Sequence, residues 1–160
     1  MAEQKTNVMR VLEQKKIPYQ AHSYPHGDEA VDGVTVARIT GQDPAKVFKT
    51  LVAQGAGKRI YVFVSPVAAE LDLKKAAKAV GEKSIAMVKV SELLGLTGYV
   101  RGGCSPIGRR KQYPTVFHKS AEDWDTVLVS AGKIGWQIEL APSELMKLTR
   151  GLTADITIEE

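Results

Sequence analysis

Two apolar stretches separated by a short glycine-rich turn constrain the fold of this chain more than any other feature. Residues 47–53 (VFKTLVA) and 59–64 (RIYVFV) are rich in the β-branched and aromatic residues that favour strands. The segment Gly55-Ala56-Gly57-Lys58 between them predicts a hairpin. A parallel crossover needs a dozen or more residues, so this pair must be antiparallel. The sequence therefore favours an α+β fold with a mixed, barrel-like β-sheet over a doubly wound parallel sheet.

Local patterns predict the remaining elements. Thr6 is a suitable N-cap for a first helix that Pro18 stops, Gly41 and Gly81 are suited to end two further helices, and Ser91 is expected to cap a short one. The predicted helices cover residues 7–16, 31–40, 71–80, 91–94 and 142–149, and the predicted strands cover 19–24, 47–53, 59–64, 115–117, 126–130 and 137–140.

Composition limits the class of protein. With 160 residues, 44% of them hydrophobic, the chain suits one domain over residues 1–160 whose core needs no metal or disulfide. The single cysteine, Cys104, excludes an intrachain disulfide and a Cys-rich zinc site. Residues 1–16 are polar and no stretch approaches the ~20 apolar residues of a membrane span, so we expect a cytoplasmic protein. A net charge of +4 permits a nucleic-acid partner without requiring one.

A lysine interrupts the first strand of the predicted hairpin. Alternation places Lys49 on the same face as Val47, Leu51 and Ala53, in a run that is otherwise apolar or β-branched. One interpretation is a lysine at the strand edge with its amine in water. The other is a partly buried lysine, whose pKa is lowered and which remains a strong donor beside a ligand. The residues alone leave both open.

Two glycine-containing segments are candidates for ligand binding. Gly102 and Gly103 allow close approach of a ligand to the main chain, where N–H groups can bind a carboxylate, a phosphate or a developing oxyanion. An ordinary connecting loop is the alternative. Residues 130–135 (SAGKIG) follow a predicted strand but do not form a phosphate loop, because Ile134 occupies the Ser/Thr position. Ser130 is either a ligand donor or a common strand-terminal serine.

Metal and protein-nucleophile chemistry find little support. His22 and His26 are separated by a predicted strand end and do not share a helical face, and His118 is the only other histidine, so we expect no metal site. Ser105 is not part of a Gly-x-Ser-x-Gly elbow. Cys104 is either a nucleophile with a depressed pKa or an incidental loop cysteine.

Taken together, these segments resemble the YbaK family of Cys-tRNA(Pro) deacylases, which are relatives of the editing domain inserted in bacterial prolyl-tRNA synthetases. The similarity covers nearly the whole chain in the same order. Its pieces are VFKTL at 47–51, SPVA at 65–68 followed by LDLKKAAK at 71–78, GYVRGGCSPIG at 98–108, and SAGKIG at 130–135 leading to IEL at 138–140.

The resemblance implies a fold, a site and a reaction. It implies helices around a mixed, barrel-like sheet, and hydrolysis of a mischarged aminoacyl-tRNA by attack of the substrate's own thiol, with no cofactor or metal. Some members carry an acidic residue at the position of Gln137; an amide cannot act as a base, so no proton-transfer role is assigned to it. The implied catalytic residues are Lys49, Gly102 and Gly103, and the implied substrate-binding residues are Tyr24, Ser105, Pro106 and Ser130.

Other functions remain open at this stage. The nearest is an Ala-tRNA(Pro) deacylase of the same superfamily, which would use water as the nucleophile. A non-catalytic module that binds aminoacyl-tRNA or a synthetase is a second, and an enzyme forming a lysine Schiff base is a third. The expected partner is an aminoacyl-tRNA, tRNA(Pro) by the resemblance, with prolyl-tRNA synthetase as a further candidate.

Overall fold

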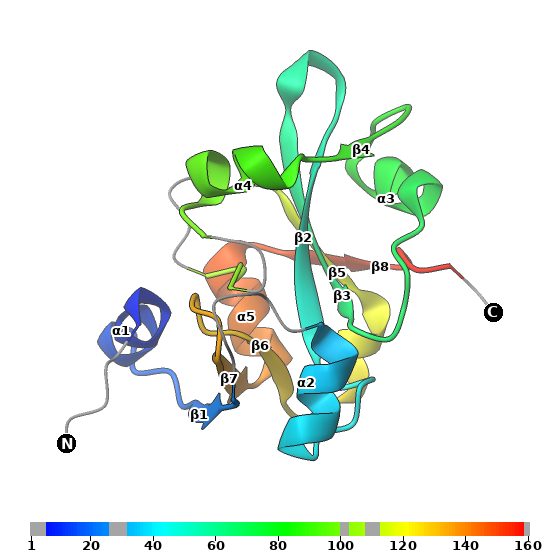
Figure 1. The fold of residues 1–160 in the computed structure, drawn as a ribbon. Coiled ribbons are helices and arrows are strands. Elements are labelled where there is room, and N and C mark those ends of the chain that lie inside the picture. The colour runs from blue at the N-terminus through cyan, green and yellow to red at the C-terminus, as the bar shows by residue number, and fades with distance from the viewer. Residues whose placement is uncertain (1–5, 26–31, 100–102, 108–112, 159–160) are drawn as a thin grey trace.

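A computed structural model describes residues 6–25, 32–99, 103–107 and 113–158 (Figure 1). The helices are α1 (Asn7–Gln14), α2 (Gly33–Thr40), α3 (Leu73–Val80), α4 (Val90–Thr97) and α5 (Pro142–Thr149), with short 3-10 turns η1 (Ala56–Lys58) and η2 (Lys119–Asp123). The strands are β1 (Gln20–Ser23), β2 (Phe48–Gln54), β3 (Ile60–Pro66), β4 (Ala86–Met87), β5 (Thr115–His118), β6 (Val127–Ser130), β7 (Trp136–Leu140) and β8 (Leu152–Ala154). In the described part of the chain every α-helix has eight residues, and none could span a bilayer.

The strands form two sheets. One has the order β1-β7-β6 and is antiparallel throughout; the other has the order β4-β2-β3-β5-β8. The predicted hairpin is confirmed, since β2 and β3 pair antiparallel from Phe48–Pro66 to Gln54–Ile60. The pairs β3–β5 and β5–β8 are parallel, and helices lie in the connections that they require. The predicted mixed α+β fold is confirmed.

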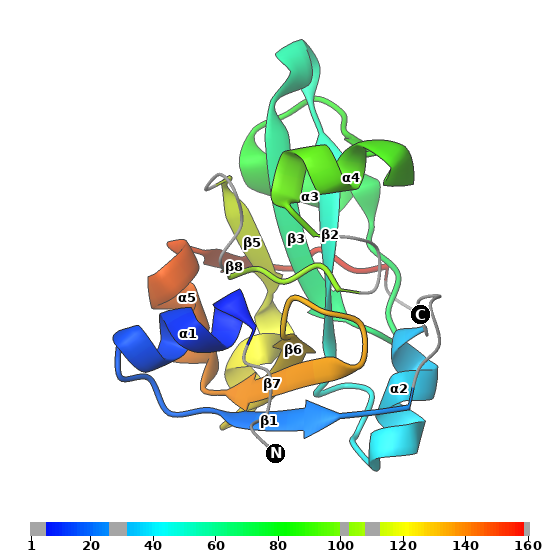
Figure 2. The ribbon, with the colours of Figure 1, turned by 60° about the vertical axis from the view of Figure 1, so that its left-hand side comes forward.

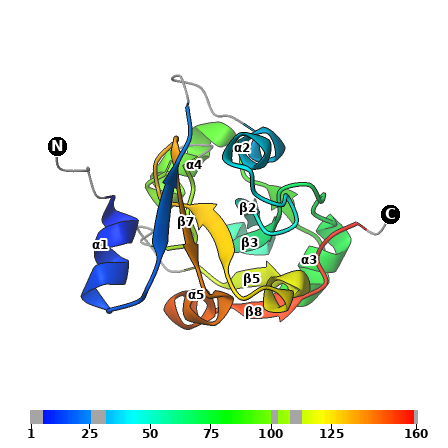
Figure 3. The same cartoon turned by 90° about the horizontal axis from the view of Figure 1, so that it is seen from below.

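The barrel-like closure of the sheet is not confirmed. Among the described residues the two sheets are joined by a single bridge, between Val47 and Leu128, which run parallel at that point. Figure 2 shows β1 and β7 side by side, with the β2–β3 hairpin extending away from them. Seen from below, α1 and α3 lie at opposite sides of the molecule (Figure 3).

Capping residues fix the ends of the helices largely as the sequence predicts. The hydroxyl of Thr6 accepts from the Met9 amide at 3.2 Å, and Gly41 and Gly81 end α2 and α3 with φ angles of 74° and 77°. The prediction of Ser91 as a cap is wrong: α4 begins at Val90, because the Glu92 amide already donates to the carbonyl of Lys89 at 2.9 Å.

The core is divided by the β2–β3–β5 sheet. One side packs Phe48, Val62, Val64 and Phe117 against α1, α5 and the β6–β7 pair. The other side packs Phe63 with residues of α3 and the C-terminal segment. A small third cluster joins Val47, Leu128 and Ala37 of α2, at the point where the two sheets meet.

Candidate active site

Lys49 is the second residue of β2 and is half-buried. Its Nζ donates to the carbonyl oxygen of Ala69 at 2.7 Å, in the loop that follows β3. Burial lowers the pKa of Lys49 below its usual value, and the nearby carboxylate of Glu70 opposes this shift. Of the two interpretations that the sequence left open, the structure supports the partly buried lysine over a strand-edge residue with its amine in water.

The strand arrangement aligns Lys49 with Ser130. Val47 and Leu128 are bridged in parallel, and the Leu128 amide donates to the carbonyl of Lys46 at 3.1 Å. Lys49 and Ser130 each lie two residues beyond that pair. Because side chains alternate along a strand, both lie on the side where Val47 and Leu128 pack with Ala37.

Ser130 begins a tight connection between β6 and β7. Its Oγ accepts from the Gly132 amide at 3.2 Å, and Gly132 and Gly135 have φ angles of 93° and 97°, which favour glycine. The Tyr24 amide donates to the carbonyl of Gly135 at 2.9 Å. Tyr24, which is buried, is therefore held against the same connection as Ser130.

Gly103 also lies against this connection. A Cβ at Gly103 would stand 3.2 Å from the Ile134 nitrogen and 3.3 Å from the Lys133 carbonyl carbon, closer than side chains normally approach a backbone. The 130–135 segment thus packs closely against the backbone of Gly103, and the predicted approach of a ligand at this position stays a prediction. Gly102 lies outside the described residues.

The other two predicted substrate-binding residues are buried. Ser105 is fully buried, and its Oγ accepts from the Ile107 amide at 3.3 Å; Pro106 beside it is also buried. Cys104 is buried as well. The structure therefore gathers Tyr24, Gly103 and Ser130 around the β6–β7 connection and aligns Lys49 with Ser130. The catalytic and substrate-binding roles of all the predicted residues stay predictions.

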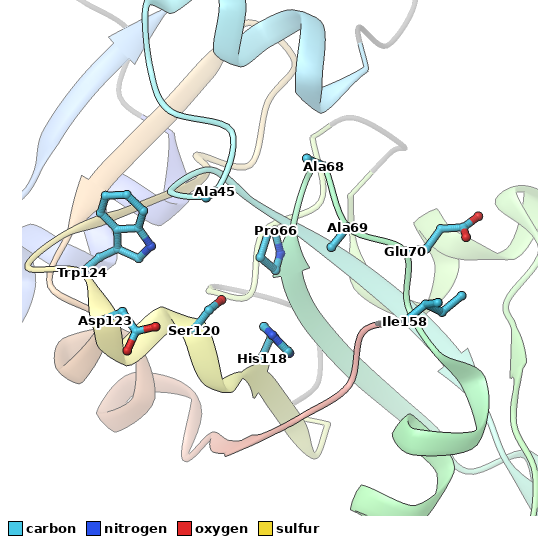
Figure 4. A pocket seen from close by; sticks show the side chains of 10 residues that line it. All are labelled: Ala45, Pro66, Ala68, Ala69, Glu70, His118, Ser120, Asp123, Trp124 and Ile158. Carbon is cyan, nitrogen blue, oxygen red and sulfur yellow. The ribbon is translucent and has the colours of Figure 1, made fainter. Parts of the chain in front are cut away.

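A cavity of about 770 Å³ lies beyond the end of β3 (Figure 4). The predicted site residues that the structure describes do not line it. Two lining residues act on Lys49: the Ala69 carbonyl accepts from its Nζ, and the Glu70 carboxylate lies near enough to oppose the lowering of its pKa. The residues lining it are Ala45, Pro66, Ala68, Ala69, Glu70, His118, Ser120, Asp123, Trp124 and Ile158.

A polar network that the sequence did not predict lies on the face of the β1–β7–β6 sheet that carries Ser130. Glu139 of β7 accepts from Lys46 Nζ at 2.7 Å and from Thr126 Oγ1 at 2.6 Å, and its Oε1 lies 2.9 Å from His22 Nε2. We call these four residues the Glu139 network. Burial alone would raise the pKa of Glu139, but the hydrogen bonds from Lys46, Thr126 and His22 outweigh it and lower the pKa to about 2.

Gln137, two residues before Glu139, lies between this network and Ser130. It pairs with Ser130 across β6–β7 and with His22 across β1–β7. The alternation Gln137-Ile138-Glu139-Leu140 was the signal available in the sequence, since it places both polar residues on one face. Within the described ranges, no cluster of His, Cys, Asp and Glu side chains is suited to hold a metal ion.

Comparison with known proteins gives a consistent set of relatives. The model of the aminoacyl-tRNA editing domain family matches residues 28–148. The chain is 45% identical over 158 residues to EbsC of Enterococcus faecalis (strain ATCC 700802 / V583), provisionally named a Cys-tRNA(Pro)/Cys-tRNA(Cys) deacylase; the match covers 99% of this chain and 96% of EbsC.

Solved structures share the fold. A chain described as a provisional trans-editing enzyme for prolyl-tRNA synthetase superposes with a TM-score of 0.83 at 23% identity, over 98% of this chain and 100% of that one. A scaffold used in computational grafting of linear epitopes gives a TM-score of 0.84 at 24% identity, over 96% of both chains. At these identities the likeness concerns the fold alone.

Proposed function

The chain belongs to the aminoacyl-tRNA editing domain family, and from this premise we propose that it is a trans-editing hydrolase that deacylates mischarged Cys-tRNA(Pro). The observation that carries the proposal is the 45% identity to EbsC across almost the full length of both chains. We take residues 1–160 to act as a single editing domain in the cytoplasm.

The reaction needs little from the protein beyond orientation and charge stabilisation. An aminoacyl ester is already activated, so the enzyme must hold the carbonyl near a nucleophile and stabilise negative charge on its oxygen. In the proposed reaction the sulfur of the substrate cysteine attacks the ester carbonyl carbon. The bond to the ribose oxygen breaks, the sugar hydroxyl leaves with the thiol proton, and water then opens the cyclic thioester to free cysteine. No metal or cofactor is required.

We assign the candidate site residues to these two tasks, orientation of the substrate and stabilisation of negative charge. We assign Lys49 to orient the substrate, through the amino group or terminal adenosine when neutral and through a phosphate when charged. The lowered pKa of Lys49, caused by burial, makes the neutral form more accessible. Backbone N–H groups of Gly102 and Gly103 are assigned to the carbonyl oxygen. Tyr24, Ser105, Pro106 and Ser130 are assigned to substrate binding, and the alignment of Ser130 with Lys49 supports its place.

Cysteine as the substrate amino acid is better supported than tRNA(Pro) as the tRNA that carries it. The name of EbsC combines cysteine with two different tRNAs, which favours cysteine over alanine as the substrate amino acid. The choice of tRNA(Pro) rests on the family resemblance. A chain of this size has limited surface for reading a tRNA, so we propose that prolyl-tRNA synthetase contributes to tRNA selection.

A deacylation assay on Cys-, Ala- and Ser-tRNA(Pro) and Cys-tRNA(Cys), with the wild type and Lys49→Ala side by side, tests this function. The wild type should release cysteine and act slowly on serine, a poorer nucleophile. Lys49→Ala should lose activity and keep its fold, as judged by circular dichroism. If the wild type releases no amino acid, the function is wrong; if Lys49→Ala stays nearly as active as the wild type, Lys49 has no part in the mechanism.

A further inference from the structure

Gln137 lies in line with the proposed site. It is directly opposite Ser130 in the antiparallel β6–β7 register, and Ser130 is aligned with Lys49 through the Val47–Leu128 bridge. Paired residues on neighbouring strands share a face and stand about 5 Å apart. We call Gln137, Ser130 and Lys49, on β7, β6 and β2, the site row: Gln137 and Ser130 are directly paired, and Ser130 and Lys49 each lie two residues beyond the bridge that joins the two sheets.

The amide oxygen of Gln137 is buried and unsatisfied. Gln137 is only 7% exposed, and its Oε1 has no hydrogen-bond partner within the described parts of the chain. Its polar neighbours on this face are otherwise engaged: Glu139 holds His22, Lys46 and Thr126, and the Ser130 hydroxyl accepts from Gly132. Native proteins rarely leave such a buried acceptor empty, because its desolvation is then uncompensated. A ligand donor would satisfy it.

A second unpaired oxygen helps to identify which residue meets a ligand. Ser65 lies opposite Lys49 in the β2–β3 register, and its Oγ also has no partner among the described residues. Ser65 is fully buried, however, whereas Gln137 retains some exposure and lies on the far side of Ser130. Of the two residues, only Gln137 keeps some exposed surface; its Oε1 is covered like the Ser65 Oγ, so rotation of the terminal amide must accompany binding of an incoming group.

The chemistry of a free aminoacyl ester supplies a matching donor. Its α-ammonium group carries N–H donors and no acceptor, and a neutral amide oxygen can receive one of them without burying a second charge. We propose that the side-chain carbonyl of Gln137 binds the α-ammonium group of the esterified amino acid, an inference that rests on the proposed deacylase function. Lys49, a cation at the other end of the row, is then left for the terminal adenosine or phosphate.

This assignment makes Gln137 a specificity residue for free aminoacyl esters. An ester whose amino group is acylated, as in a peptidyl-tRNA or an N-formylated initiator, lacks the ammonium and brings a bulky group to the same position. Such esters would leave the Gln137 oxygen unpaired and would be poor substrates, because sites built to hydrogen-bond a group discriminate strongly against analogues that lack it.

Single-turnover deacylation of Cys-tRNA(Pro) and N-acetyl-Cys-tRNA(Pro) tests the proposal, with wild type, Gln137→Met, Gln137→Glu and Thr50→Val. The wild type should cleave the free ester far faster than the acetylated one. Gln137→Met removes the acceptor at similar volume and should slow cleavage of the free ester about 10- to 100-fold, as expected for a hydrogen bond to a charged group. It should leave the slow rate on the acetylated ester unchanged and should not lower the melting temperature.

The other two variants are controls. Gln137→Glu keeps an oxygen acceptor and should stay within about threefold of the wild type on the free ester. Thr50→Val deletes another buried, unpaired oxygen, on the opposite face of β2, and should leave both rates unchanged.

Three results would overturn the inference: equal cleavage of both esters by the wild type, a Gln137→Met rate on the free ester equal to that of the wild type, or an equal loss in Gln137→Glu and Gln137→Met. A wild type that releases no cysteine instead refutes the deacylase function itself.

Discussion

On β7, Glu139 and Gln137 lie two residues apart on the same face, yet their hydrogen bonding differs completely. Glu139 holds Lys46, Thr126 and His22, from three other segments of the chain, whereas the Oε1 of Gln137 has no partner among the described residues. Satisfied polar groups stabilise a fold, and an unsatisfied one costs stability. The hydrogen bonds of the Glu139 network connect separate segments of the chain, and on the proposal made above the site row beside it retains polar atoms for a ligand.

The largest expected effect on stability follows from removing Glu139, the residue at the centre of the Glu139 network. Glu139→Ala should lower the free energy of unfolding by about 3 kcal/mol, because Lys46 would be left as a largely buried, unpaired charge. Urea denaturation at pH 7 measures this. Glu122→Ala, which removes an exposed carboxylate of η2, should change stability by no more than about 0.5 kcal/mol. Equal losses in the two variants would show that the network does not stabilise the fold.

Acid should weaken the same region. The pKa of Glu139 is lowered from 4.5 to about 2, so the stability that it contributes is complete above pH 5 and is lost as the pH falls toward 2. Between pH 7 and pH 3 the wild type should lose about 2 kcal/mol relative to Glu139→Gln, which cannot titrate at this position. Urea denaturation of both proteins across this range gives the difference. A constant difference would mean that the folded-state pKa of Glu139 is not depressed.

A smaller change removes one donor from the network. Thr126 Oγ1 donates to Glu139 at 2.6 Å, and Thr126→Val replaces this hydroxyl with a methyl group of similar size. The free energy of unfolding should fall by about 1.5 kcal/mol, the usual range for a hydrogen bond to a charged group. The variant should still deacylate Cys-tRNA(Pro), since Thr126 is outside the site row. Unchanged stability would remove Thr126 from the network.

The separation in sequence between contacting residues explains which features of the structure could be predicted from the sequence. The β2–β3 hairpin, the Thr6 cap and the glycine ends of α2 and α3 depend on residues close in sequence, and the structure confirms them. The partners of Glu139 lie 93 and 117 residues away for Lys46 and His22, and no local pattern indicates them.

The same limit applies to the candidate site. Lys49 stood out because a lysine interrupts an apolar strand, but its alignment with Ser130 depends on a bridge between distant strands. The two short strands β4 and β8 were missed for a related reason. Each is only two or three residues long and is defined by its pairing with β2 or β5, which a local pattern does not contain.

The smallest expected effect comes from Thr50→Val. It makes the same chemical change as Thr126→Val, but at a hydroxyl that has no hydrogen-bond partner in the described part of the chain, and so tests the contrast between paired and unpaired polar groups. Thr50 Oγ1 is buried and has no partner within the described residues, so Thr50→Val removes an oxygen that makes no hydrogen bond. The free energy of unfolding should stay the same or rise, by up to about 1 kcal/mol, because the desolvation cost of that oxygen disappears. Thr126→Val should lower the free energy of unfolding. Urea denaturation of both variants measures whether this free energy rises or falls in each. If both substitutions destabilise equally, packing of the threonine side chain and not the pairing of its hydroxyl determines stability, and the contrast between Glu139 and Gln137 loses its physical basis.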